Sequence, residues 1–232
     1  MRKWFITVVV ASLFLLSMTT SRASNDGRKL VDFSVNTQLY QSLKKKSSQP
    51  LNDIIVLPKK NFDQEEAAKM INRIDSLPAS LLNKIDDQGI TLKLFTGKLT
   101  DNPTAKQLAG KIPRGYQTKI TWDDVPGIGG GKVVLVKIGS SDKGKGHGSV
   151  NLELHEMAHS IDKFVLNNIS QTKEFKHVME LEHDQLFPGN SYFLYPEEYF
   201  AESFAMYYLN NDTNQQLRKQ APKTFEIIKG LK

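Results

Sequence analysis

The sequence predicts an α+β fold, in which a small N-terminal α/β part with a mixed sheet precedes a helical C-terminal part. Two observations lead to this prediction. Apolar runs of strand length recur up to residue 138, and from residue 150 onward the apolar residues have helical spacing. Any chemistry is then expected where the sheet meets the helices. The 232 residues, 39% of them hydrophobic, suit a single domain with a sizeable core.

The first 23 residues have the pattern of a secretory leader. Arg2 and Lys3 precede an uncharged apolar stretch over residues 4–18, and Ser21 and Ala23 supply the small residues of a cleavage site. This stretch is shorter than the ~20 residues that span a bilayer, so an uncleaved membrane anchor is the less favoured alternative. We therefore expect a secreted, extracellular protein without membrane contact after cleavage.

Composition narrows the possible function classes. Three of the 31 basic residues and none of the 25 acidic residues lie in the leader, so the net charge of +6 falls to +3 in the mature chain. This modest charge argues against a nucleic-acid partner. The absence of cysteine excludes disulfides, thiolate metal ligands and a cysteine nucleophile.

Residues 24–52 are predicted to form a polar, flexible arm, because they contain few apolar residues and a lysine- and serine-rich stretch at 44–48. The folded domain is expected over residues 53–232. It begins with a short strand that Pro58 ends. The other expected elements, in chain order, are a helix capped by Asp63 and Glu66, a helix ended by Gly89, strands over 90–95 and 133–138, and helices from Val150 onward with breaks around 167–170, 188–190 and 210–213.

The motif H-E-x-x-H occurs as His155-Glu156-Met157-Ala158-His159. On a helix, residues four apart share one face and lie about 6 Å apart, so both imidazoles can reach one metal ion. Glu156 lies beside that face and is expected to act as the general base towards a water molecule. Neutral imidazoles at this spacing suit Zn²⁺, and one ion is predicted per chain. Two surface histidines on an ordinary amphipathic helix are the alternative.

Proteins with an H-E-x-x-H zinc site fall into subfamilies that differ in the residue that completes the metal site. A metzincin-type extension needs glycine and histidine where this chain has Asp162 and Val165, so that branch is excluded. His147, His177 and His183 have no partner at ligand spacing, and we interpret them as structural or surface residues. The third ligand is therefore expected to be a glutamate on a following helix.

Residues 195–204 predict that helix and offer two adjacent acids. Glu198 has Glu202 one turn later, whereas Glu197 has Ala201. A ligand carboxylate followed one turn later by a second acid can bind zinc while the second acid orients a ligand histidine. Glu198 is thus assigned to the metal and Glu202 to the histidine, with solvent-exposed helix acids as the alternative.

Several stretches resemble known zinc proteases. Residues 155–162, 198–204 and 221–225 are similar to the protease domain of anthrax lethal factor. The stretches 121–127, 143–147, 151–156 and 195–198 more closely resemble the secreted bacterial Pro-Pro endopeptidases. The resemblance implies a zincin-like metalloendopeptidase that hydrolyses Pro-Pro bonds in proline-rich extracellular or cell-surface proteins, with release of adhesins as the expected outcome.

The resemblance also implies roles for individual residues. Glu198 matches the family's third ligand, and the oxyanion-stabilising tyrosine corresponds to Tyr192 if the preceding loop is one residue shorter; Tyr195 is then ordinary core. Trp122 is expected against the substrate prolines, with a core tryptophan as the alternative. The remaining residues expected to contact substrate are Gly129, Gly130, Gly131 and Lys132, in a rim loop that could instead be a plain hairpin turn, and Glu197.

Two other functions are considered. The first is a lethal factor-like toxin protease acting on a host protein, although about 180 residues from Asp53 onward leave no room for a delivery domain. The second is a non-catalytic binding module, against which the intact Glu156 argues. We expect a monomer.

Overall fold

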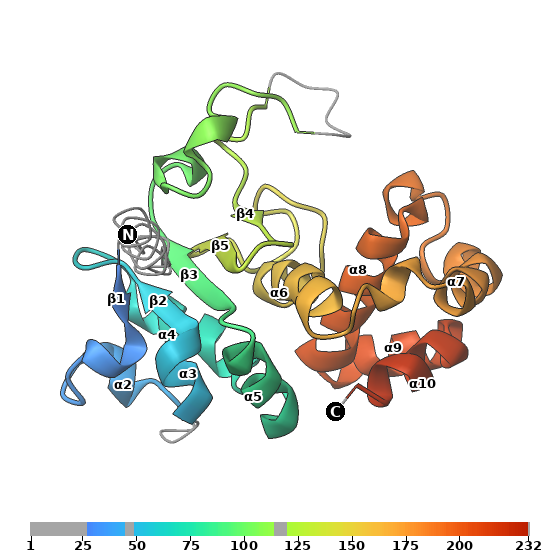
Figure 1. Cartoon of the computed structure of the whole chain (residues 1–232), viewed down its shortest axis with the longest axis horizontal. Helices are drawn as coiled ribbons and strands as arrows, with labels where there is room; N and C mark the ends of the chain where they lie inside the picture. The colour runs from blue at the N-terminus through green and yellow to red at the C-terminus, as the bar shows by residue number, and fades with distance from the viewer. Residues whose placement is uncertain (1–26, 45–48, 114–119, 232) are drawn as a thin grey trace, which may run out of the picture.

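The computed structural model describes residues 27–44, 49–113 and 120–231, and the expected leader lies outside these ranges. The described chain confirms the α+β class. A mixed sheet with its own helices forms one side of the molecule, helices form the other, and α6 (Leu152–Phe164) lies between them (Figure 1). Within these ranges no helix is both long and apolar enough to cross a bilayer.

The sheet has five strands among the described residues, in the order β1-β2-β3-β5-β4. The central strands β2, β3 and β5 are parallel, and β1 and β4 pair antiparallel at the two edges. Consecutive buried side chains fill the central strands, as expected of strands covered on both faces. The strand bounds are β1 (Arg28–Lys29), β2 (Ile55–Leu57), β3 (Thr91–Phe95), β4 (Gly127–Ile128) and β5 (Val133–Lys137).

The described part of the expected polar arm is folded, which corrects that prediction. It forms β1, a 3-10 turn, α2 (Gln38–Gln41) and α3 (Gln49–Ile54). Its few apolar side chains, including Leu30, Leu39 and Leu51, are buried in the main core. Because α3 continues to Ile54, the short strand expected over residues 54–57 begins at Ile55 and not at Ile54.

The two N-terminal helices expected next are present. Asp63 caps α4 (Gln64–Ile74) by accepting a 2.9 Å hydrogen bond from the backbone N–H of Glu66. The helix α5 (Ala79–Asp87) stops just before Gly89, whose φ of +64° lies in the left-handed region that favours glycine.

The C-terminal part consists of α6, α7 (Lys173–Leu186), α8 (Pro196–Leu209), α9 (Asn211–Gln220) and α10 (Pro222–Lys229). Asn151 caps α6, its side chain accepting a hydrogen bond from Leu154 N–H. The helices α6 and α8 pack against each other. Ala158 on α6 and Ala201 on α8 are fully buried, and such small side chains allow two helices to approach closely. The H-E-x-x-H motif lies on α6, and Glu198 and Glu202 lie on α8.

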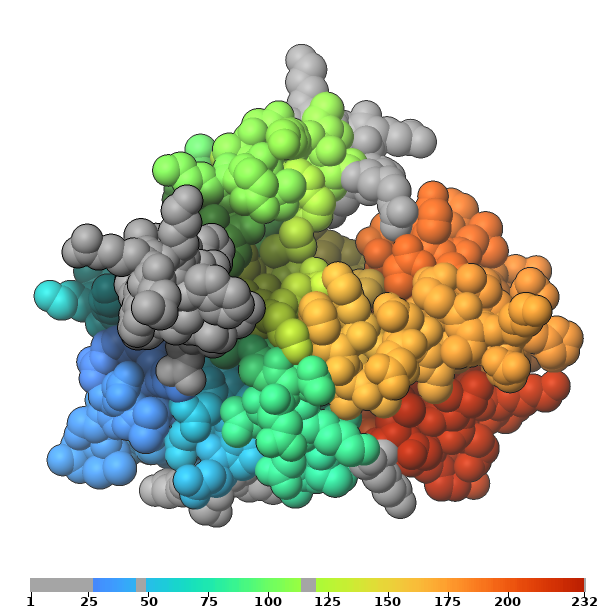
Figure 2. Space-filling model, viewed as in Figure 1, coloured from blue at the N-terminus to red at the C-terminus, as the bar shows by residue number. Residues whose placement is uncertain are grey.

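The described residues between β3 and β4 form a projecting lobe. A second, smaller core joins Leu99, Ala105 and Val125 of this lobe to Phe95 of β3 and Leu135 of β5. Asp123 ties this lobe together, since its carboxylate accepts hydrogen bonds from the hydroxyls of Thr100 and Thr121 and from Gly110 N–H, at 2.6, 2.9 and 2.7 Å. In the space-filling view the molecule is hollowed between this green lobe and the orange helical part (Figure 2).

Candidate active site

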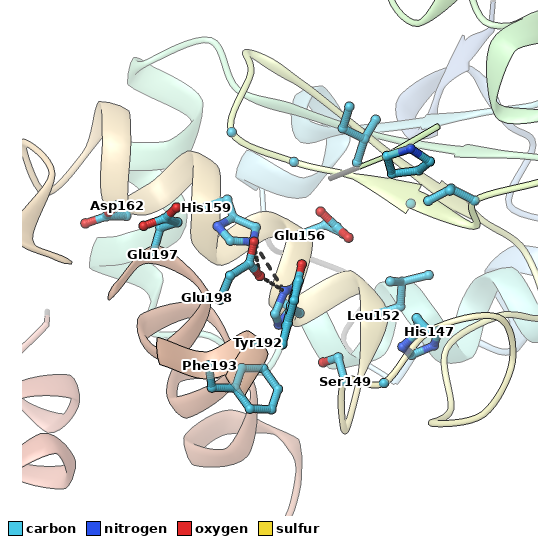
Figure 3. A pocket seen from close by; sticks show the side chains of 18 of the residues that line it. His147, Ser149, Leu152, Glu156, His159, Asp162, Tyr192, Phe193, Glu197 and Glu198 are labelled. Carbon is cyan, nitrogen blue, oxygen red and sulfur yellow. Dashed lines mark hydrogen bonds and ion pairs between the residues drawn. The ribbon is translucent and has the colours of Figure 1, made fainter. Parts of the chain in front are cut away.

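Two helices bring three potential metal ligands together. His155 and His159 lie one turn apart on α6, with their Nε2 atoms 3.2 Å from each other. Glu198, in the first turn of α8, places Oε2 3.2 Å from Nε2 of His155 and 3.4 Å from Nε2 of His159. The ligand atoms of all three residues lie within 4.8 Å of one another (Figure 3). This cluster is compatible with a metal site.

Glu202 supports the cluster from behind. Its Oε2 is 3.0 Å from Nδ1 of His155, and its Oε1 accepts a 2.8 Å hydrogen bond from the N–H of Val150, just before α6. Only 1% of Glu202 is exposed. When the N–H at Nδ1 of His155 donates a hydrogen bond to Glu202, Nε2 carries the lone pair. This lone pair faces Glu198 and His159, as binding of a metal requires.

Charges in the cluster shift the pKa values of its members. Burial lowers the pKa of His155, but Glu198 and Glu202 outweigh burial and raise it to about 10. Burial raises the pKa of Glu198, yet contacts with His155 and His159 hold it below the ordinary value. Burial raises the pKa of Glu156, with the two histidines opposing the rise. The cluster thus concentrates negative charge beside two imidazoles.

A cavity of about 830 Å³ opens in front of the cluster. Glu156 lines it but is not one of the three clustered ligands, and Figure 3 shows its carboxylate apart from them. Tyr192, 43% exposed, stands at the cavity with its hydroxyl towards Glu156 (Figure 3). The walls include Pro113, Trp122, Val125, Pro126, Ile128, Leu152 and Phe193, and backbone from Gly127 to Gly130.

Trp122 was expected either to contact substrate or to belong to the core, and its position agrees with both. Its indole lines the cavity and also packs, partly buried, against the small core of the lobe. The backbone N–H of Trp122 donates to the carbonyl of Lys111 at 2.8 Å. The tryptophan is therefore held by the lobe at the rim of the cavity.

The structure brings most but not all of the expected substrate-contacting residues to the cavity. Gly129, Gly130 and Glu197 are among its described lining residues, whereas Gly131 and Lys132 are not. The Lys132 ammonium donates to the carbonyl of Gln88 and lies 4.2 Å from the centre of the Phe164 ring. The alternation of side chains beside β5 turns Lys132 away from the cavity, so its predicted substrate contact is not supported.

One further expectation needs correction, because Tyr195, considered as core, is 42% exposed where it precedes the first turn of α8. His147, interpreted as structural or surface, forms a 2.8 Å hydrogen bond with the carbonyl of Ser140, as a structural residue would, and it also lines the cavity. His177 is exposed and His183 is buried on α7, in agreement with the sequence interpretation.

Two further residues of α6, Asp162 and Ser160, contact the surroundings of the site although the sequence did not single them out as site residues. Asp162 accepts hydrogen bonds from Ser170 N–H and Ser170 Oγ, at 3.0 and 2.5 Å, and lines the cavity. Ser160, fully buried, bonds to the glycine turn after β4. Helix spacing was the available signal, because Ser160 lies four residues after Glu156 and Asp162 three residues after His159, and such residues share a helix face.

The fold and the clustered histidines and glutamate define the class of protein, a zincin-like metalloendopeptidase. A family model described as anthrax toxin lethal factor, N- and C-terminal domain, matches residues 42–231. The chain belongs to this family, and within it to the Pro-Pro endopeptidases, on the sequence matches that follow.

The relatives cover most of the chain. A Pro-Pro endopeptidase of Clostridioides difficile (strain 630) is 41% identical over 227 residues, which is 97% of this chain and 96% of the relative. One from Paenibacillus alvei is 40% identical over 183 residues, 78% of this chain and 84% of the relative. The solved structure of the Pro-Pro endopeptidase from Paenibacillus alvei superposes with a TM-score of 0.76 at 40% identity, covering 79% of this chain and all of that one. The match thus confirms the family suggested by the motifs.

Proposed function

We propose that this protein is a zinc-dependent endopeptidase that hydrolyses Pro-Pro bonds in proline-rich proteins outside the cell. The observation that carries the proposal is the cluster of His155, His159 and Glu198 beside Glu156, at the floor of a proline- and aromatic-walled cavity. The names of its two curated relatives support the same bond specificity.

Zinc fits the spacing of the ligand atoms. Tetrahedral zinc with bonds of ~2.0–2.1 Å has neighbouring ligand atoms about 3.3 Å apart. The three separations in the cluster are 3.2, 3.2 and 3.4 Å. His155, His159 and Glu198 would hold the ion, and two imidazoles with one carboxylate leave a coordination position open. When bound there, zinc supplies Lewis acidity towards the scissile carbonyl and lowers the pKa of a water ligand.

The residues of the chain would handle the proton and the developing charge. Glu156 takes the proton of the attacking water and delivers it to the leaving proline nitrogen. The raised pKa of Glu156, which burial causes, brings this carboxyl closer to the neutral range where a general base works best. The hydroxyl of Tyr192 donates a hydrogen bond to the oxyanion that forms on the carbonyl.

The walls of the cavity suit a polyproline segment. Each proline ring fixes φ and removes the backbone N–H, so such a peptide cannot form a full ladder with an edge strand. The cavity offers only a short edge, β4, with the ring of Trp122 on the adjoining lobe. Aromatic surfaces bind preformed polyproline helices at low entropic cost. The cavity is therefore better suited to rigid proline-rich peptides than to extended strands.

Peptide cleavage tests this proposal. A mixed peptide library, analysed by mass spectrometry, is expected to show cuts only between consecutive prolines. A chelator should abolish these cuts, and one equivalent of zinc should restore them. Glu156→Gln is expected to bind zinc but to lower kcat by about 10²–10⁴-fold. Efficient cutting of proline-free peptides would reject the proposal.

We also propose that the protein is exported and acts at the cell surface. A leader over residues 1–23 predicts a mature N-terminus at Ser24, which sequencing of protein from a culture supernatant tests. Cell-surface adhesins with Pro-Pro bonds are the proposed substrates, and their release into the medium by the intact protein but not by Glu156→Gln is the expected result. We propose that the mature protein acts as a monomer, which light scattering measures directly.

A further inference from the structure

Ser160 connects α6 to the turn that follows β4. Its Oγ accepts a 3.0 Å hydrogen bond from the N–H of Gly130 and donates one of 2.8 Å to the carbonyl of Gly131. The serine is fully buried, and the Lys163 ammonium adds a 3.2 Å bond to the carbonyl of Gly130. This glycine turn, residues 129–131, is thus fastened to the helix that carries both histidines.

The glycine turn lies directly against Glu156. The backbone that leads into the turn packs closely against the Glu156 side chain, since a Cβ on Gly127 would lie 3.1 Å from Cγ of Glu156. A Cβ on Gly129 would collide with the carbonyl of Glu156, so only glycine permits this approach. Gly130 has φ of +76°, which lets the chain reverse towards Ser160. A small shift of the turn would therefore move the backbone against which Glu156 packs.

We propose that Ser160 is a positioning residue, whose two hydrogen bonds fix the glycine turn so that the backbone packed against Glu156 holds this side chain oriented for proton transfer. The inference rests on the proposed function, because it requires Glu156 to be the general base. Misplacement of a catalytic group by about 1 Å can cost 10²-fold in rate. Loss of one anchor to a turn should cost less, since Lys163 still contacts Gly130.

The test is the Ser160→Ala variant of the zinc-loaded full-length mature protein. We expect kcat on a Pro-Pro peptide to fall about tenfold, with KM within twofold and one zinc ion retained. Hydrogen exchange of a peptide covering residues 127–132 should become faster, which checks the contact independently of activity. Ser203→Ala is the matched control, because Ser203 is also a buried helix serine and its hydroxyl has no hydrogen-bond partner among the described residues. Its kcat, KM and exchange at 127–132 should not change.

A second pair of variants keeps the inference testable if Ser160→Ala does not fold. Gly130→Ala strains the turn through its positive φ, while the nearest atom to the new Cβ is 3.9 Å away. Gly139→Ala introduces the same kind of strain, at φ of +86°, in a residue that does not line the cavity. We expect Gly130→Ala to lower kcat by at least fivefold and Gly139→Ala to leave it within twofold.

Three results would overturn the inference. They are an unchanged kcat despite faster exchange at 127–132, a fall in kcat that lost zinc fully explains, and equal effects of the two glycine variants. A parent protein that cuts no Pro-Pro bond would instead reject the proposed function itself. Failure of the proposed function is therefore seen in the parent protein. Failure of the role of Ser160 is seen only when the variants are compared with an active parent.

Discussion

Oε2 of Glu202 lies 3.0 Å from Nδ1 of His155, while Oε1 of the same carboxylate accepts the N–H of Val150. One buried side chain on α8 therefore orients a histidine on α6 and also fixes the chain just before that helix begins. Because both oxygens are used, the carboxylate has little freedom to turn away from His155. The orientation of this imidazole depends on a residue that is not itself among the clustered ligands.

Removal of this carboxylate should weaken metal binding. Loss of the partner of a ligand histidine typically costs 10–100-fold in metal affinity. We expect Glu202→Ala to lower zinc affinity by that factor, measured by competition with a chromogenic chelator. Glu197→Ala is the control, since Glu197 accepts a hydrogen bond from Gln171 and contributes no atom to the cluster. Equal zinc affinities of the two variants would contradict the role of Glu202.

Tyr192 should act on the rate and not on binding. If its hydroxyl stabilises the oxyanion, Tyr192→Phe is expected to lower kcat by about 10²-fold with little change in KM. Tyr195→Phe is the matched control, because Tyr195 has similar exposure and does not line the cavity. Steady-state kinetics on one Pro-Pro peptide give kcat and KM for both variants. A kcat of Tyr192→Phe within threefold of the parent would exclude this tyrosine as the donor.

A buried ion pair should stabilise the contact between α4 and α6. Arg73 donates to Glu153 at 2.8 Å, and Glu153 is fully buried with its second oxygen unpaired among the described residues. Removal of one partner of such a pair leaves a buried charge and costs roughly 3–5 kcal/mol. We expect Arg73→Met to lower the free energy of unfolding, measured with urea, by about 3 kcal/mol. The loss should lie at the lower end of the range because the Arg73 side chain is itself 27% exposed.

Two variants test whether the buried charge is the cause. Arg73→Met combined with Glu153→Leu removes both charges and should recover most of the lost stability. Lys69→Ala breaks the exposed pair with Glu66 and should change stability by less than about 0.5 kcal/mol. A double variant no more stable than Arg73→Met would show that packing, not the unpaired charge, causes the loss.

Much of the fold could be predicted because its signals are local. Asp63 caps a helix, Gly89 follows one, and the spacing of Glu198 and Glu202 puts both on one face of α8. Each depends on residues within one or two turns of chain. The H-E-x-x-H spacing is local in the same way, which is why the pairing of His155 and His159 could be predicted.

The remainder depends on contacts between distant parts of the chain. Leu39 and Leu51 lie in a polar stretch of sequence. They are buried because they pack into the same core as the apolar face of α4, which the local sequence does not indicate. Lys132 faces Gln88 because of where α5 ends, 44 residues earlier. The bonds of Ser160 to the glycine turn span about 30 residues. No periodicity in the sequence reports such approaches, so sequence patterns could not predict them.

Asp123 should make the stability of the lobe that carries Trp122 depend on acid pH. Hydrogen bonds from Thr100, Gly110 and Thr121 lower the pKa of Asp123 from its ordinary value of 3.8 to about 2. Below about pH 3.8 the unfolded chain binds a proton that the folded carboxylate does not yet accept. The stabilising contribution is therefore complete above that pH and is lost as the pH falls through about 2.

Substitution of this carboxylate should remove that part of the pH dependence. Asp123→Asn is expected to be less stable than the parent at pH 7, with the difference shrinking between pH 4 and pH 2. Urea unfolding followed by tryptophan fluorescence reports the lobe directly, because Trp122 is the one tryptophan outside the expected leader over residues 1–23. Asp124→Asn, at the exposed neighbouring position, should keep the pH dependence of the parent. If Asp123→Asn lost stability between pH 4 and pH 2 as steeply as the parent, other carboxylates would have to account for the acid sensitivity of the lobe.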